Sequence, residues 1–129
     1  ALSIWASFPC LDSKNNKLLI TILDRNIEGS KKLLNYGDAG LLNKAEQINS
    51  ELINGVEVTK AVVSFSQYDP TLDKYVEESR SYQILIPLSS TATLRFYVDI
   101  SDKNILDQIL STFKFIDWYA RIKSFSTAA

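Results

Sequence analysis

Four carboxylates in the stretch YDPTLDKYVEE are the first residues whose spacing could carry chemistry: Asp69, Asp73, Glu77 and Glu78. Glycoside hydrolysis uses two such groups held about 5 to 10 Å apart in a cleft. The same oxygens could hold Ca²⁺, but the D-x-[DN]-x-[DN]-G pattern of a calcium loop is absent. The simpler interpretation is a solvated hairpin loop. We therefore predict no catalytic residue and no metal ligand in this stretch.

The rest of the sequence lacks the usual catalytic residue sets. It has no His and one cysteine, Cys10, which excludes Ser-His-Asp and Cys-His pairs, zinc sites of His and Cys, and an intramolecular disulfide. Neither G-x-x-x-x-G-K-[ST] nor G-x-G-x-x-G occurs, so the common phosphate-binding loops are missing. We predict a protein that is not an enzyme and uses no cofactor.

Aromatic side chains are the better candidates for a binding surface, and they occupy polar-facing or terminal positions: Tyr68, Tyr75, Tyr97, Trp118 and Tyr119. Arg95, Tyr97 and Asp99 share the polar side of one predicted strand. They form an exposed row if no helix covers that side, whereas a covering helix would make Tyr97 part of the core. Our predicted binding residues are Tyr68, Tyr75, Arg95 and Tyr97, against the alternative that these rings pack under loops or at sheet edges.

Length and charge set the class of protein. The 129 residues fit one domain, which we place at 1–129 without assigning a structure to 1–16 or 117–129. Fourteen basic residues nearly balance fifteen acidic ones and are scattered, so nucleic acid is not an expected partner. No apolar run approaches the roughly 18 to 20 residues that span a bilayer.

The start of the sequence suggests processing. The chain contains no Met and begins at Ala1, so we expect a piece of a longer precursor. The segment ALSIWASFP has no basic n-region and is not an intact signal peptide. Pro9 stands where a bacterial lipobox needs a small residue before its cysteine, so we do not expect Cys10 to be lipidated.

Strand patterns dominate the second half. SYQILIPL (81–88) and TLRFYVDI (93–100) alternate apolar and polar residues and predict an antiparallel hairpin of half-buried strands. VEVTKAVVSFSQY (56–68) predicts a long strand whose apolar parity changes near Thr59 to Ala61, which suggests a bulge there. DPTLDK is a predicted turn leading to a strand near Tyr75, and KLLITILD (17–24) predicts another strand.

Between Gly29 and Val56 the sequence shows no clear period, and we expect loops with one or two short helical turns. Near the C-terminus, ILDQILSTFKF (105–115) places apolar residues at helical spacing after Ser101 and Asp102, which could cap the helix. We expect this helix to pack on the sheet.

SYQILIPL, TLRFYVDI and ILDQILSTFKF together resemble the PsbP-like group of bacterial proteins, relatives of the extrinsic protein of the photosystem II oxygen-evolving complex. The resemblance runs from about Asn54 to Phe115 and is concentrated in the last residues from Asp107. It implies an α+β fold, a twisted antiparallel sheet flanked by helices as an α/β/α sandwich, with the C-terminal helix packed on the sheet.

The resemblance also implies a function, because the best-known members are accessory subunits and many others are secreted or envelope-anchored. We expect a non-catalytic binding or assembly module of a bacterial envelope or extracellular protein, docking to a larger protein or envelope component. The alternative is a small-ligand or metal-ion-binding protein with a pocket between sheet and helix. The sequence does not fix the oligomeric state.

Overall fold

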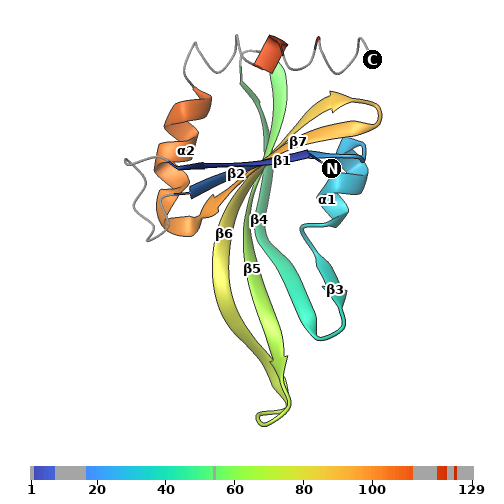
Figure 1. Ribbon diagram of the computed structural model, residues 1–129, viewed down its shortest axis with the longest axis vertical. Coiled ribbons are helices and arrows are strands. Elements are labelled where there is room, and N and C mark those ends of the chain that lie inside the picture. The colour runs from blue at the N-terminus through green and yellow to red at the C-terminus, as the bar shows by residue number, and fades with distance from the viewer. Residues whose placement is uncertain (1, 8–16, 54, 112–118, 122–123, 125–129) are drawn as a thin grey trace.

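Antiparallel strands make up most of the molecule and form one curled sheet (Figure 1). The structure is a computed structural model that describes residues 2–7, 17–53, 55–111, 119–121 and 124. The order across the sheet is β1-β2-β7-β6-β5-β4-β3. The strands are β1 (Leu2–Ser7), β2 (Lys17–Leu23), β3 (Tyr36–Asp38), β4 (Leu41–Ile53), β5 (Val56–Asp69), β6 (Lys74–Ser89) and β7 (Ala92–Asp99).

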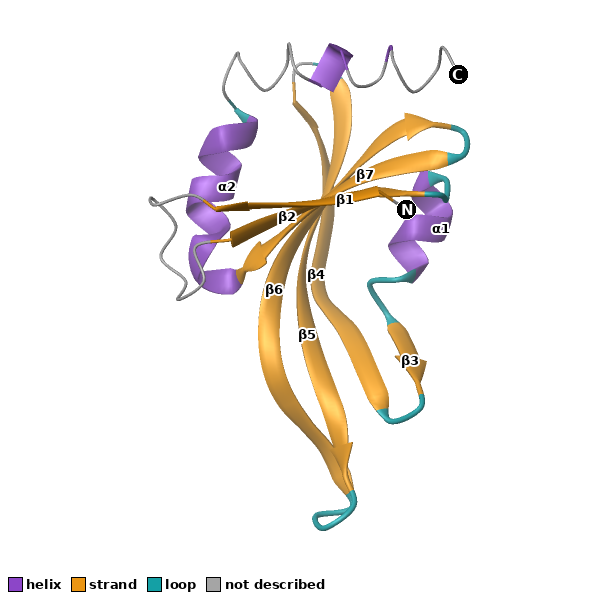
Figure 2. Ribbon diagram, viewed as in Figure 1, coloured by secondary structure: helices purple, strands orange, loops and turns teal. Residues whose placement is uncertain are grey.

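The helical elements are short: α1 (Ile27–Lys32), the 3₁₀ turn η1 (Ile100–Asp102) and α2 (Lys103–Leu110), with a further helical piece at 119–121. Figure 2 shows them as small pieces beside a sheet that curls like half a barrel. The predicted α/β/α sandwich is therefore wrong, and the fold is mostly β. Helices of six and eight residues are too short to form layers over a sheet whose longest strand has sixteen.

Several predicted elements are present. β6 and β7 form the expected hairpin, with Ile84 opposite Phe96. The turn after Asp69 leads into β6 at Lys74, and β2 begins at Lys17. The predicted terminal helix forms as α2, and residues 112–115 of the predicted segment lie outside the described residues. Asp102 stands at its N-cap without a side-chain capping bond, whereas Asp99 caps η1 and accepts from the backbone of Ser101 at 2.9 Å.

The segment expected to contain loops and helical turns is partly wrong. α1 is a short helix, but β3 and the thirteen-residue β4 occupy most of the rest. β4 is exposed along most of its length. Its sequence therefore lacks the alternation of apolar and polar residues from which a strand is predicted. Gly55, at φ +81°, follows β4 in the conformation that glycine tolerates best.

The bulge expected near Thr59 to Ala61 is also absent. Within the described ladders, the register of β5 changes against β4 between Ala45 and Gln47, and against β6 at Phe65. The apolar parity of β5 changes because both of its faces are buried. Val58 and Val62 belong to one core cluster and Ala61 and Val63 to another.

The larger core lies on the face of the sheet that α2 covers. It joins the even-numbered residues of β6 and β7 to the helix: Tyr82, Ile84, Ile86, Leu88, Leu94, Phe96, Val98, Leu106 and Leu110. The smaller core lies on the other face, where Leu34 packs against Ala61, Val63 and Leu85, with Ile27 of α1 beside them. The strand SYQILIPL is thus buried on both faces rather than half-buried.

We predict that Leu106→Ala lowers the free energy of unfolding by about 2 to 5 kcal/mol, because Leu106 is fully buried between α2 and the sheet. Urea unfolding measures the change. Gln108→Ala, on the exposed side of the same helix, serves as the control and should stay within about 0.5 kcal/mol of wild type. Equal effects of the two changes would show that α2 does not close the core.

Candidate functional site

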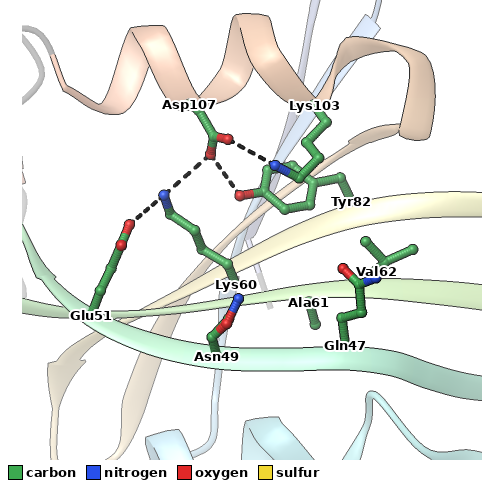
Figure 3. Close-up of a pocket in the computed structure, with 9 residues that line it drawn as sticks. All are labelled: Gln47, Asn49, Glu51, Lys60, Ala61, Val62, Tyr82, Lys103 and Asp107. Carbon is green, nitrogen blue, oxygen red and sulfur yellow. Dashed lines mark hydrogen bonds and ion pairs between the residues drawn. The ribbon is translucent and has the colours of Figure 1, made fainter.

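A polar cavity of about 230 Å³ lies between α2 and strands β4 to β6 (Figure 3). Its lining residues come from four elements: Gln47, Asn49 and Glu51 of β4, Lys60, Ala61 and Val62 of β5, Tyr82 of β6, and Lys103 and Asp107 of α2. Its position between sheet and helix is the one that the alternative functional prediction required. The side chains that line the cavity therefore determine which kind of ligand it could bind.

Ladder register and helix period bring the polar residues together. Asn49 pairs with Lys60 across β4 and β5, and Val62 pairs with Tyr82 across β5 and β6. Alternate strand residues share a face, so the Lys60 and Tyr82 side chains both lie on the side that α2 covers. Lys103 and Asp107 are four residues apart on α2 and therefore share one side of the helix.

Asp107 is the centre of this arrangement (Figure 3). Its Oδ1 accepts a 2.6 Å hydrogen bond from the Tyr82 hydroxyl and lies 3.3 Å from the Lys60 ammonium. Its Oδ2 lies 3.2 Å from the Lys103 ammonium, which also sits 4.9 Å from the centroid of the Tyr82 ring. We call these residues, together with Glu51, which forms an ion pair with Lys60, the Asp107 cluster.

Contacts within the cluster and burial shift the pKa values of Tyr82, Asp107 and Lys60 away from neutral pH. Burial raises the pKa of Tyr82 far above its ordinary value, and the bond to Asp107 adds to the effect. Burial alone would raise the pKa of Asp107, but the bonds from Tyr82, Lys103 and Lys60 outweigh it and lower that pKa. Burial alone would lower the pKa of Lys60, but Glu51 and Asp107 raise it.

Two ammonium groups and two carboxylates therefore neutralise one another. A general acid or base works best with a pKa near the operating pH. Here the pKa values of Tyr82, Asp107 and Lys60 are shifted away from neutral pH. A metal ion would have to displace lysines from both carboxylates. Within the described ranges, moreover, no group of three His, Cys, Asp or Glu could hold one. The cluster fastens α2 to the sheet, and its cavity offers polar contacts to a small molecule at most.

Two of the predicted binding residues lie together at the end of the β5–β6 hairpin. Tyr68 and Tyr75 are opposite each other in the ladder, with ring centroids 5.6 Å apart in an edge-to-face arrangement. They are 41% and 48% exposed, and Leu72 in the turn between them is 56% exposed. We call Tyr68, Leu72 and Tyr75 the distal tip.

Arg95 and Tyr97, the other two predicted binding residues, lie on β7. The Arg95 guanidinium lies 5.8 Å from the centroid of the Tyr97 ring, and both side chains are partly buried on the face opposite α2. Burial lowers the pKa of Arg95. Arg95 and Tyr97 therefore do not form a fully exposed row, and the structure does not bring them together with the distal tip.

Of the two aromatic residues near the C-terminus, Tyr119 is buried and donates a 2.6 Å bond to the carbonyl of Pro87. Trp118 lies outside the described residues.

The four carboxylates considered first do not come together in one site, and three of them have separate local contacts. Asp69 accepts from the backbone of Thr71 at 2.9 Å, and Asp73 accepts from the Tyr68 hydroxyl. Glu77 pairs with Arg80 at 3.0 Å, and Glu78 lies next to it on β6. The sequence analysis missed the Asp107 cluster instead. The four-residue spacing of Lys103 and Asp107 was the one signal that could have indicated it.

Comparison with family models, curated proteins and solved structures finds no match for this chain. The PsbP-like resemblance therefore stays a prediction from sequence. Among the described residues, no helix has the length and hydrophobicity to cross a membrane.

We predict that Asp107→Asn lowers the free energy of unfolding by about 1 to 3 kcal/mol at neutral pH, because it removes the carboxylate charge that faces Lys60 and Lys103 and that accepts from the Tyr82 hydroxyl. Chemical unfolding at several pH values measures this. Since the folded pKa of Asp107 is lowered, its contribution is complete above about pH 4 and disappears as the pH falls further. The variant should therefore approach wild type in acid.

Glu77→Gln is the matched control, because Glu77 belongs to an exposed ion pair with Arg80. We expect a change within about 0.5 kcal/mol. A constant difference between Asp107→Asn and wild type at every pH would show that the Asp107 charge contributes nothing.

Proposed function

We propose that this chain is a non-catalytic binding or assembly module that docks to a larger protein of the bacterial envelope or exterior. The distal tip carries the proposal. The placement in the envelope rests on the PsbP-like resemblance, from which we keep the accessory role and not the sandwich fold.

The distal tip has the geometry of a docking element. The β5–β6 hairpin extends beyond the rest of the sheet and ends in the tip (Figure 1). Tyrosine is enriched at protein interfaces because a large apolar ring carries a hydroxyl that can bond on either side of the interface. Exposed apolar side chains gathered at a protruding end fit an apolar pocket of a partner.

The tip is also held in place before a partner binds. The Tyr68 hydroxyl donates to Asp73, a bond that raises the pKa of Tyr68, and the backbone of Tyr68 donates to the carbonyl of Gly40 at 2.8 Å. Asp69 accepts from the backbone of Thr71 within the turn. Side chains that are already ordered lose less conformational entropy on binding, so a preformed tip favours affinity.

The Asp107 cluster supports the non-catalytic part of the proposal. Its carboxylate and ammonium groups are paired with one another, and the pKa shifts of Tyr82, Asp107 and Lys60 keep the protonation state of each group fixed near neutral pH. Proton transfer at neutral pH would need the opposite arrangement.

We predict that the Tyr68→Ala/Tyr75→Ala variant captures much less of the partner protein than wild type does. The immobilised domain captures proteins from an envelope extract of the source organism, and quantitative mass spectrometry compares each variant with wild type. One protein enriched by wild type should fall about tenfold or more with the double variant, because truncating a buried interface aromatic typically costs above 1 kcal/mol.

Tyr36→Ala is the matched control. Tyr36 is 51% exposed, and the ladder through Asn43 and Phe65 places it on the face of the sheet opposite Tyr68. It should retain the partner. Equal loss in the control and the tip variant would contradict docking through the tip, and measurable turnover of a substrate, abolished by Asp107→Asn, would contradict the non-catalytic part.

The cavity favours a second candidate, the binding of a small polar molecule. Gln47 and Asn49 bring side-chain amides to the lining, and Lys103 brings an ammonium group. We expect this candidate, if correct, to show as a small molecule retained on native mass spectrometry of protein isolated from its source. Gln47→Ala/Asn49→Ala would then release it, and Tyr68→Ala/Tyr75→Ala would not. A mass equal to the bare chain would exclude the candidate.

A further inference from the structure

Among the described residues, β4 has a strand partner on its outer edge only near its start. β3 pairs with β4 from Leu41 to Asn43. Just beyond, the side chain of Asn35 accepts from the backbone of Ala45 at 2.8 Å. From Gln47 to Ile53, no strand in the described part of the chain pairs with this edge, and Figure 1 shows β3 ending well short of it. Unpaired backbone groups along such an edge can bind another strand.

Apolar side chains stand along this edge. Ile48 and Leu52 share one face of β4 and are 49% and 75% exposed, with Ser50 between them. Natural edge strands usually carry charges, proline or bulges that prevent pairing. Here the bulge lies at Ala45 to Gln47, before the apolar residues, and the charged side chain between them, Glu51, lies on the opposite face and is paired with Lys60.

We infer that this edge is an interface with a second copy of the chain, in which the two β4 strands pair antiparallel about a two-fold axis at Ser50. Two antiparallel edge strands related by a two-fold axis perpendicular to the sheet keep each face continuous, so residues that face one another lie on the same side. Each symmetric register is therefore centred on one residue of β4.

The order of residues selects the register. With the axis at Ser50, Ile48 of each copy faces Leu52 of the other, and Asn49 faces Glu51. Apolar pairs thus meet on one face of the sheet, and amide meets carboxylate on the other. Cross-strand pairs of these kinds stabilise a sheet, while like charges opposite each other destabilise it.

Other centres are less favourable. An axis at Asn49 places Leu52 against Glu46 and Gln47 against Glu51. An axis at Glu51 places two carboxylates together. An axis at Ile48 brings Leu52 to Lys44, next to the segment that β3 covers.

The same pairing joins the two polar cavities. Asn49 and Glu51 both line the cavity, and Glu51 pairs with Lys60 inside it. In the dimer the Asn49 amide of one copy meets the Glu51 carboxylate of the other at this opening. The antiparallel arrangement also places the two distal tips at opposite ends of one continuous sheet. The inference uses a different surface from the proposed function and does not depend on it.

A cysteine on the axis tests the register. In a Cys10→Ser background, Ser50→Cys places one thiol opposite its own copy, at a separation that antiparallel strands share with disulfides. Mild oxidation should give a covalent dimer as the main product. Asn49→Cys, one residue away, should not cross-link efficiently. Cross-linking of Asn49→Cys in preference to Ser50→Cys would overturn the register.

Charge substitutions test the interface in solution. Ile48→Lys/Leu52→Lys sets like charges against each other in the dimer, whereas Ile48→Lys/Leu52→Glu sets opposite charges against each other and removes similar apolar area. Sedimentation velocity should show self-association of wild type. The like-charge variant should weaken it about tenfold or more relative to the opposite-charge variant.

Both sites are exposed, and unchanged circular dichroism and unfolding midpoints would confirm that the two variants fold. A wild-type protein that stays monomeric at every accessible concentration would overturn the inference. So would equal association of the two variants, because the proposed register requires them to differ.

Discussion

Burial of β6 on both faces is the constraint on which the rest of the structure depends. Tyr82 and Ile84 point toward α2, and Leu85 points toward Leu34 on the other side. A strand with two apolar faces needs cover on each, and the chain supplies that cover with very short helices. The sheet curls, and β3 and β4 at one of its edges are left largely exposed.

The polar contacts of α2 follow from the same constraint. An eight-residue helix buries few side chains, chiefly Leu106 and Leu110. The Asp107 cluster adds an ion pair from Lys60 of β5 and a hydrogen bond from Tyr82 of β6 to the same helix, and Glu51 of β4 pairs with Lys60. A carboxylate with several donors around it is stable in a partly buried position, whereas the same groups unpaired would destabilise the fold.

The distal tip and the β4 edge both expose apolar side chains outside these cores, and they differ in kind. The distal tip is a protruding end with ordered aromatic rings, suited to a pocket in another protein. The β4 edge offers backbone hydrogen-bonding groups and apolar side chains, which suit pairing with another strand. A protein that used both would link copies of itself through β4 and present a tip at each end of the pair, which fits an assembly role.

By itself, the sequence determined the strands with strong alternation, the hairpin of β6 and β7, the amphipathic helix near the C-terminus and the aromatic residues at the β5–β6 turn. These features follow from local periodicity, because a buried face imposes its period on the residues that form it. Only the tertiary structure decided that β4 is a strand, since a solvated edge imposes no apolar pattern. It also decided that Lys60, Tyr82 and Asp107 meet, because ladder register and the placement of α2 bring together residues that are far apart in the chain.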